Sequence, residues 1–287
     1  MKHHLIKEKI ACQFVGIPKV NNYESLKWSV SSIGLQIFTK LGGSPWCMKT
    51  SKEECLIIGI GQSHIKSNQN KIEKYFSFSI MTDSTGIFKN IKVLSENINE
   101  NEYLNGLGNR LRGIIQENMH NYNNIVIHTS FRIKDSETKK INNIISDISK
   151  EIDKKFMIIR FSNNHDYIGF NLKANSKTPY ESTIVNINNN EYLIWFEGLS
   201  STTETIKTRI GPPIHLTIDF PKTYEKKDVW NNLQDAINLS GANWRGFNAK
   251  TIPVSILYAR LLNSFLAEFN KNELEKIDIE QLTPWFI

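Results

Sequence analysis

Cysteine is scarce in this chain of 287 residues, which contains only Cys12, Cys47 and Cys55. An odd number of cysteines without metal-ligand spacing argues against a disulfide framework and against a cysteine-based zinc site. The longest apolar runs are far too short to cross a bilayer, and the chain opens without a secretory signal. We therefore expect a protein of the reducing cytoplasm that has no membrane span.

Familiar catalytic motifs are missing as well. The sequence has no glycine-rich phosphate loop and no Gly-x-Ser-x-Gly nucleophile motif. Basic residues outnumber acidic ones by 35 to 29, which gives a formal net charge of +6 and a pI near 9.0. This balance is compatible with an anionic partner and equally with ordinary basic solubility, so charge alone does not choose between them.

Apolar runs and helical periodicity alternate through the middle of the chain. They predict strands over 55–62, 75–82, 87–94, 124–129 and 156–162, and helices over 101–118 and 136–153. Asp83 to Gly86 reads as the turn between the second and third of these strands. The order is that of the ribonuclease-H-like fold, an α/β architecture in which helices flank a mixed central sheet.

The two ends of the chain carry further elements. A strand is expected at Cys12 to Val15 and a helix from Ser25 to Leu41, which Gly42 and Gly43 end. The apolar face expected for that helix carries Leu26, Val30, Ile33 and Ile37. Towards the C-terminus we expect a hairpin of 182–187 with 191–196, a strand over 214–220 and helices over 225–239 and 253–270. Pro253 opens the last helix, whose expected buried stripe is Val254, Leu257, Leu261 and Phe265.

Three segments together carry a resemblance to a known family. They are Ala11 to Val15, Gly34 to Gly43 with its Thr-Lys-Leu-Gly-Gly ending, and Asn238 to Ser255. In this order and spacing they resemble the MID–PIWI half of Argonaute proteins, closest to the short prokaryotic type, over nearly the whole chain. The resemblance implies that residues 1–50 are the C-terminal part of a MID-like domain, a partial Rossmann-like segment. Residues 51–287 would be a PIWI domain with the ribonuclease-H-like fold.

The resemblance implies a pocket for the 5′ end of a guide strand. Its phosphate-binding residues would be Gln13, Gln36, Lys40, Arg245 and Ile287. The chain-terminal carboxylate of Ile287 would share a Mg²⁺ ion with the guide phosphate. An ammonium group and amide donors suit a terminal phosphate, because they form charge-assisted hydrogen bonds with it.

Each of these residues also has a plainer interpretation. Lys40 alone could be a solvated lysine near a helix C-terminus, and Gln13 a strand amide bonded to backbone. Arg245 could be a surface arginine stacked on Trp244, and the end of the chain could simply dock Trp285 on the core.

Some family features have no clear counterpart in this sequence. Lys250 could contact guide backbone or be a surface charge. The Tyr and Lys that the family places upstream of its Gln are not matched, although Lys2 or Lys7 could supply the charge. Another chain could also complete the MID domain.

The acids of the family's two-metal cleavage site are missing. The first aligns with Gly61, the second with Ser130, and the last ligand falls at Ser240 or Gly241. A hard divalent cation needs several converging oxygens, which these residues do not supply. We therefore predict no catalytic residues and no cleavage.

Other titratable residues near the predicted strand ends have simpler roles. Asp219 is the one acid that could substitute, although a turn-forming Asp is commoner, and Asp135 fits a helix N-cap. His64 and His128 are interpreted as packed or hydrogen-bonded side chains.

The leading hypothesis is a guide-dependent nucleic-acid-binding protein without slicer activity. It would hold a short guide RNA or DNA by its 5′ end and pair it with a complementary target strand. The resemblance implies prokaryotic defence against plasmids or phage through a partner effector protein. Two alternatives stay open: an endonuclease with a rearranged acid set that uses Asp219 or Asp135, and a scaffold subunit that no longer binds guides.

Overall fold

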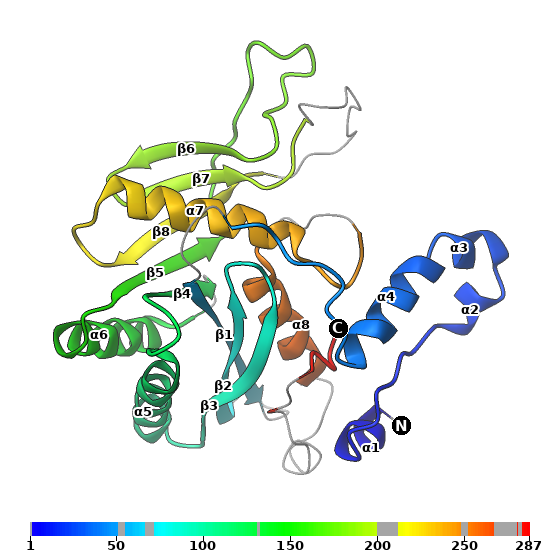
Figure 1. Cartoon of the computed structure of the whole chain (residues 1–287), viewed down its shortest axis with the longest axis horizontal. Coiled ribbons are helices and arrows are strands. Elements are labelled where there is room, and N and C mark those ends of the chain that lie inside the picture. The colour runs from blue at the N-terminus through cyan, green and yellow to red at the C-terminus, as the bar shows by residue number, and fades with distance from the viewer. Residues whose placement is uncertain are drawn as a thin grey trace.

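An eight-stranded mixed sheet forms the centre of the molecule (Figure 1). The computed structural model describes residues 2–50, 55–66, 72–130, 133–199, 212–247, 252–266, 280 and 283–287. The strands are β1 (Cys55–Lys66), β2 (Ile72–Asp83), β3 (Phe88–Asn97), β4 (Asn124–Ser130), β5 (Lys155–Ser162), β6 (Thr183–Asn188), β7 (Glu191–Trp195) and β8 (Ile214–Phe220). Their order across the sheet is β3-β2-β1-β4-β5-β8-β7-β6.

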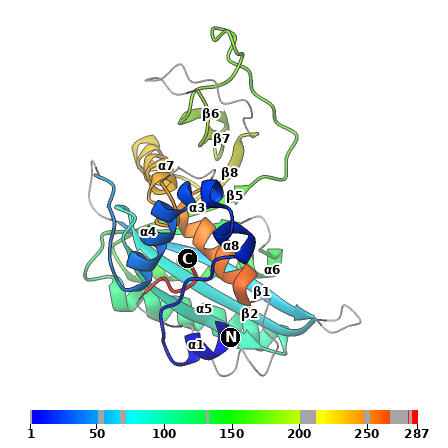
Figure 2. The same cartoon turned by 90° about the vertical axis from the view of Figure 1, so that its right-hand side faces the viewer.

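Helices precede and flank this sheet. They are α1 (Lys2–Lys7), α2 (Ile17–Val20), α3 (Tyr23–Lys27), α4 (Val30–Lys40), α5 (Glu100–Asn118), α6 (Asp135–Glu151), α7 (Lys226–Gly241) and α8 (Val254–Leu266). Seen from the side, α4, α8 and the C-terminus lie close together, whereas β6 and β7 lie at the other end of the molecule (Figure 2).

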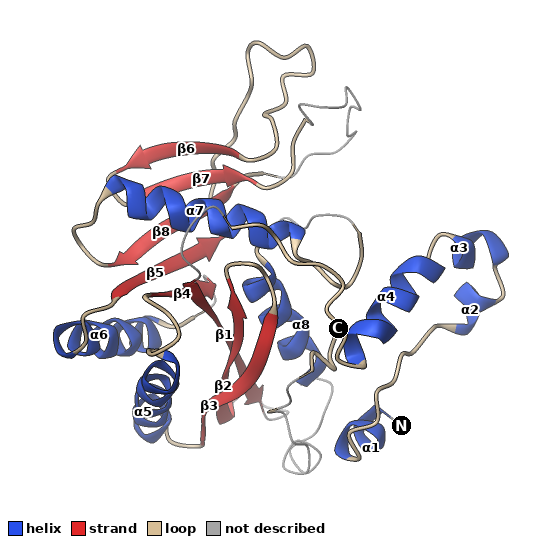
Figure 3. Cartoon of the chain, in the orientation of Figure 1, coloured by secondary structure: helices blue, strands red, loops and turns tan. Residues whose placement is uncertain are grey.

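Alternation along the strands builds two hydrophobic cores, one on each face of the sheet. The helices that cover these faces are drawn in blue against the red strands in Figure 3. Leu56, Ile58 and Ile60 of β1 pack with α5 and α6. Ile57 belongs to the other core, with side chains of α7 and α8. Every residue of β1 from Cys55 to Gly61 is buried, which explains why this strand reads as an unbroken apolar run.

The predicted ribonuclease-H-like order is confirmed. β1 pairs antiparallel with β2 and parallel with β4, and β4 pairs parallel with β5. The predicted strands and helices between residues 55 and 162 are all present, as are the hairpin of β6 with β7 and the two C-terminal helices. The division at residue 50 stays a prediction.

The strand expected at Cys12 to Val15 is wrong, because this segment is a loop. An extended segment becomes a strand only when a neighbour offers backbone groups for pairing. Here the carbonyl of Cys12 accepts a hydrogen bond from the Lys40 side chain instead.

The single helix expected from Ser25 to Leu41 is wrong too, because it is divided into α3 and α4. At the break, the Ser29 hydroxyl donates to the carbonyl of Ser25 at 2.9 Å, a local bond that competes with helix propagation. Val30 and Ile37, expected on its apolar face, are exposed, and Thr39 is the buried residue of α4.

The stripe expected on the last helix is displaced around its axis. Val254 is buried, but Leu257, Leu261 and Phe265 are only partly covered. The side chains that are buried on α8 are Val254, Ser255, Ile256, Tyr258, Ala259, Leu262 and Leu266. A further small correction concerns α6, whose N-cap is Lys134, with Asp135 as the first helical residue.

Candidate nucleic-acid end-binding site

Lys40 is the last residue of α4, and its position is fixed by a glycine-dependent helix end. Gly42 has a φ of +92°, in the left-handed region that favours glycine. The N–H of Gly43 donates to the carbonyl of Phe38 at 3.0 Å, and that of Gly42 donates to Thr39 at 3.0 Å. This pair of bonds is the Schellman motif, so the predicted glycine stop is confirmed and Lys40 lies in the final helical turn.

The Lys40 ammonium joins the helix end to the preceding loop. It donates to the Oε1 atom of Gln13 at 2.7 Å and to the carbonyl of Cys12 at 2.9 Å. One turn earlier, the amide of Gln36 donates to the backbone carbonyl of Arg245 at 3.0 Å. These bonds connect three segments that are far apart in the sequence.

The end of the chain is packed rather than frayed. Trp285, Phe286 and Ile287 are each less than 10% exposed. Phe286 packs against Tyr258 at a ring separation of 5.7 Å, and Trp285 packs against Phe265 at 5.2 Å. The expected docking of this segment is therefore correct, and it brings Ile287 to the same cavity as Lys40.

The five predicted phosphate-site residues all line one cavity of about 250 Å³. The complete lining is Ile6, Cys12, Gln13, Phe14, Gln36, Lys40, Arg245, Leu261, Ser264, Phe265, Trp285, Phe286 and Ile287. The lining has a lysine, an arginine and two glutamines, and no Asp or Glu side chain. Such a set can bind an anion of phosphate size by charge-assisted hydrogen bonds.

Arg245 is exposed, but its neighbour Trp244 is only 2% exposed. The indole N–H of Trp244 donates to the carbonyl of Trp46 at 3.0 Å. No cation–π contact joins Arg245 to Trp244 in the described part of the chain, so the stacking alternative is not what the structure shows. Trp244 instead anchors the loop from which the Arg245 side chain extends.

Other lysines weighed for this site lie elsewhere or outside the described residues. Lys7 is exposed and does not line the cavity, although its neighbour Ile6 does. The side chain of Lys2 and all of Lys250 lie outside the described residues.

Sequence reasoning missed several lining residues. Ser264 and Phe265 lie on α8 at helical spacing from Leu261, so all three reach the cavity from one face. That spacing is visible in the sequence, but it fits a core stripe equally well. Nothing in the sequence marks Ile6 or Cys12 as lining residues.

Gly61, aligned with the family's first metal-binding acid, lies in a filled part of the core. A Cβ atom added there would come within 2.4 Å of the Phe78 ring and 3.2 Å of the Ala259 methyl. The neighbouring Gly59 is enclosed in the same way, because a Cβ atom added there would come within 2.3 Å of the carbonyl oxygen of Ser255. The helix α8 therefore packs against β1 at the place where a carboxylate would have to project.

Ser130 and His128 project from the adjacent strand towards the same face of the sheet. His128 pairs with Gly59 in the register of β4 with β1, and Ser130 follows two residues later. The His128 ring is fully buried, forms a 2.8 Å hydrogen bond with the Ser255 hydroxyl and packs edge-on against Phe161. Burial lowers its pKa to about 3, so the ring is neutral near pH 7. The packed interpretation of His128 is confirmed, and the His64 side chain lies outside the described residues.

The structure does not bring Gly241 to Gly61 and Ser130. Gly241 ends α7, where its carbonyl accepts a hydrogen bond from the Trp46 indole and its α-carbon faces Met48. Its neighbour Ala242 contacts Gly86 in the β2–β3 turn, at the Cys55 end of β1. Gly61 lies six residues further along that strand, so the third aligned position is separate from the other two.

The acids proposed as substitutes lie on the opposite face of the sheet. Asp219 forms a 3.0 Å ion pair with Arg160. Since Phe161 packs in the core with α7 and α8, its strand neighbour Arg160 faces the other side of the sheet, where α6 lies. Burial raises the pKa of the Asp219 carboxyl, and the guanidinium opposes that shift. Asp135 begins α6, which packs on this same side. Among the described residues, no group of three or more His, Cys, Asp and Glu side chains could hold a metal ion.

Comparison with known proteins identifies the family. The Piwi domain matches residues 1–271, so this chain belongs to the Piwi family and is an Argonaute-family PIWI region. A "Piwi protein" of Archaeoglobus fulgidus is 25% identical over 313 residues, which cover 100% of this chain and 71% of the relative.

Solved structures share the fold. Crystal structures of A. aeolicus Argonaute and of Aa-Ago with externally bound siRNA each superpose with a TM-score of 0.68 at 13% identity, over 100% of this chain. The chain spans only 38% to 39% of the length of those structures. No described helix of this chain is both long and apolar enough to cross a membrane.

Proposed function

We propose that this chain binds the 5′-phosphorylated end of a short guide strand and presents the guide for pairing with a complementary target. The observation that carries this proposal is the convergence of Gln13, Gln36, Lys40, Arg245 and the Ile287 carboxylate on one cavity. Chance would not be expected to bring an ammonium, a guanidinium and two amides from separate segments to one cavity.

A divalent cation fits this set of residues. Mg²⁺ is usually bound by one or two carboxylates together with substrate phosphate oxygens and water. The Ile287 carboxylate would be the charged oxygen ligand of this lining, and the side chains of Gln36 and Ser264 add neutral oxygens. When bound, the ion would neutralise the repulsion between the carboxylate and a guide phosphate.

Binding of 5′-phosphorylated and 5′-hydroxyl oligonucleotides, as both RNA and DNA, tests the proposal. We expect the phosphorylated strand to bind about tenfold or more tightly, because several charge-assisted hydrogen bonds depend on the phosphate. Arg245→Ala should remove most of this preference while the protein stays folded, since the Arg245 side chain is exposed. Lys19→Ala removes an exposed lysine of α2 outside the cavity and is the matched control.

Equal affinity for both strands would contradict the proposal and would favour the scaffold alternative. Loss of the preference in both variants would likewise contradict it, because the effect would then reflect general charge rather than this cavity.

We further propose that the chain does not cut its target. The support is Gly61 with its filled surroundings, Ser130, and the position of Asp219 across the sheet. Incubation with guide, matched target and Mg²⁺ or Mn²⁺ should leave the target intact. Guide-dependent cleavage that is lost in Asp219→Ala would overturn this and establish the rearranged nuclease.

Without cleavage, a biological output requires a partner, which we propose to be an effector protein or a chain that completes the MID domain in defence against plasmids or phage. More than half of the exposed large apolar side chains of the described residues lie between residues 10 and 41. They are Ile10, Phe14, Ile17, Val20, Tyr23, Trp28, Val30, Ile37, Phe38 and Leu41. An apolar concentration of this kind is typical of a protein interface. Co-purification from the native host should yield a partner protein in stoichiometric amount. The double variant Ile17→Ser, Trp28→Ser should no longer retain this partner.

A further inference from the structure

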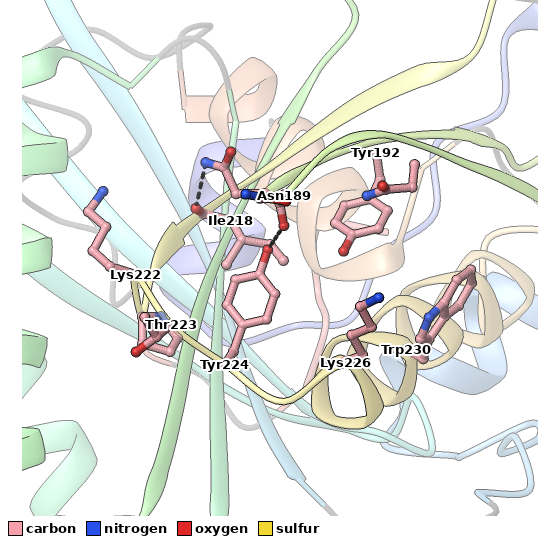
Figure 4. Close-up of a pocket in the computed structure, with 11 residues that line it drawn as sticks. Asn189, Tyr192, Ile218, Lys222, Thr223, Tyr224, Lys226 and Trp230 are labelled. Atoms are coloured by element: carbon pink, nitrogen blue, oxygen red, sulfur yellow. Dashed lines mark hydrogen bonds between the residues drawn. The ribbon is translucent and has the colours of Figure 1, made fainter.

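A second cavity, of about 600 Å³, lies at the β6 end of the sheet, remote from the phosphate site (Figure 4). The β6–β7 turn, the segment after β8 and the start of α7 form its walls. Tyr192, Tyr224 and Trp230 supply three aromatic rings to the lining, and Lys222 and Lys226 supply two cations. No Asp or Glu side chain belongs to this lining.

The side chains are arranged around the hollow rather than stacked into a core. Lys226 and Trp230 are one turn apart on α7 and extend towards Tyr192, whereas Lys222 extends from the other side of Tyr224 (Figure 4). Trp230 is 47% exposed, and its ring lies 6.5 Å from that of Tyr192 with the two planes 72° apart, so the rings are not stacked face to face. An accessible indole beside an ammonium group provides a place for a planar, negatively charged ligand.

The hairpin that forms one wall is hydrogen-bonded to β8 and to the loop after it, and this wall is therefore preformed. The side-chain amide of Asn190 donates to the carbonyl of Ile218 at 3.4 Å. The hydroxyl of Tyr224 donates to the carbonyl of Asn189, which closes the turn against the loop after β8. The side-chain amide of Asn189 makes no hydrogen bond of its own to the described residues, so it can donate to and accept from a ligand.

We propose that this cavity binds a nucleotide unit, with its base on the face of Trp230 and its phosphate at Lys226. Aromatic platforms beside basic side chains are how proteins hold unpaired bases without reading sequence. The Asn189 amide adds a hydrogen-bonding edge for the base. The site is distinct from the 5′-end cavity and does not depend on a terminal phosphate, so it can be tested separately.

Photocrosslinking gives a residue-level test. The probe is a short 5′-hydroxyl oligonucleotide that carries 5-iodouridine, used with the full chain and with its Arg245→Ala variant. The expected crosslink, located by fragmentation to a single side chain, is at Trp230 or Tyr224 in both proteins. Crosslinks confined to residues of the 5′-end cavity would overturn this inference while leaving the proposed function intact.

Affinity measurements with a matched charge control complete the test. Lys226→Glu should weaken binding of the same 5′-hydroxyl strand about tenfold, and Trp230→Ala by a similar factor, because each removes one recognition element. Lys227→Glu makes the same change in net charge one residue further along the helix but outside this lining, and should change affinity by less than about threefold. Equal loss in Lys226→Glu and Lys227→Glu would overturn the proposal, since only general charge would then matter.

Free AMP and UMP distinguish the two sources of such a ligand. If added AMP or UMP reduces crosslinking at Trp230, the site binds free nucleotides. If only an unlabelled oligonucleotide reduces it, the site binds an unpaired stretch of guide or target. Both results support a nucleotide site. Absence of binding by either class, with normal folding, would refute it.

Discussion

At the scale of single residues, Gly61, which the family resemblance places at the first metal-binding acid, lies where the core leaves no room for a side chain. The space that an aspartate would need is occupied by the Phe78 ring and the Ala259 methyl. Both belong to elements that also pack on each other, because α8 lies directly over β1 and β2. The packing of the core around Gly61 therefore leaves no space for an aspartate.

Replacing Gly61 by Asp should destabilise the fold and should not restore cleavage. Overpacking a core costs about 1–3 kcal/mol, and an unpaired buried carboxylate adds to that cost. We expect chemical denaturation to show a loss of at least about 2 kcal/mol in the free energy of unfolding.

Gly113→Asp is the matched control for this change. Gly113 lies on α5 with nothing within 4 Å of an added Cβ atom, so the same substitution there should change stability by about 0.5 kcal/mol or less. A folded, equally stable Gly61→Asp protein would contradict the filled-site argument.

His128 makes stability depend on pH. Its pKa of about 3 in the folded state lies below the ordinary value of 6.5, so between these values the unfolded chain binds more protons. The contribution of His128 to stability is therefore complete above about pH 6.5 and is lost progressively as pH falls towards 3. Buried Glu137 and Asp219, whose pKa values are raised, act in the opposite sense as pH falls.

The variant His128→Asn separates these contributions, because it cannot titrate and retains a group that can bond to the Ser255 hydroxyl. We expect its free energy of unfolding to fall less steeply than that of the natural protein between pH 6.5 and about 4. Parallel pH profiles for the two proteins would show that His128 is not the buried neutral group described above.

At the scale of elements, one glycine inside α4 and one just after it have opposite roles. Gly42 adopts a φ of +92° to form the helix end, whereas Gly34 lies inside the helix with nothing within 4 Å of an added Cβ. An alanine at Gly42 must take up left-handed backbone, at a cost of about 1–2 kcal/mol. An alanine at Gly34 should stabilise by about 0.5–1 kcal/mol through better helix propensity.

Thermal unfolding of Gly42→Ala and Gly34→Ala should therefore shift in opposite directions. Gly42→Ala should also weaken binding of a 5′-phosphorylated strand, because the helix end that positions Lys40 is disturbed. If Gly42→Ala leaves both stability and binding unchanged, the helix end does not control the position of Lys40.

The elements also show what the sequence can and cannot predict. β1, β4 and β5 are predictable because strands buried on both faces read as short apolar runs. The orientation of α8 is not, because Gly59 and Gly61 admit the helix backbone closely and select small residues such as Ser255 and Ala259 for the contact. A pattern that weighs only large apolar residues chooses the wrong face.

The candidate site also has a part that the sequence predicts and a part that it does not. Gln13, Gln36, Lys40, Arg245 and Ile287 can be named only because the motifs around them resemble a family, and the structure then places them in one cavity. Periodicity alone would leave Lys40 as a helix-end lysine. The second cavity has no sequence signal beyond the spacing of Lys226 and Trp230, because the hairpin that completes it is distant in sequence.

At the scale of the whole molecule, the first cavity depends on both ends of the chain. Ile6 and Gln13 approach from the N-terminal side, and Trp285, Phe286 and Ile287 approach from the C-terminus. The last three residues belong to the core that α7 and α8 share, so the position of the terminal carboxylate is coupled to global folding. The site can form only after residues almost a full chain apart have packed together.

Converting the C-terminal carboxylate of Ile287 to a carboxamide, by ligation of a synthetic C-terminal peptide, isolates the electrostatic part of this arrangement. The side chains of Trp285 and Phe286 are unchanged, so the thermal midpoint should stay within about 2 °C of that of the natural chain. Without Mg²⁺, the amide should bind a 5′-phosphorylated strand as well as the carboxylate form or better, because a charge repulsion has been removed. With Mg²⁺, the order should reverse, since only the carboxylate can share the ion with the phosphate. Binding titrations in Mg²⁺ and in EDTA measure this reversal of the order of affinities. If Mg²⁺ raises the affinity of the amide form as much as that of the natural chain, the C-terminus does not bind the metal.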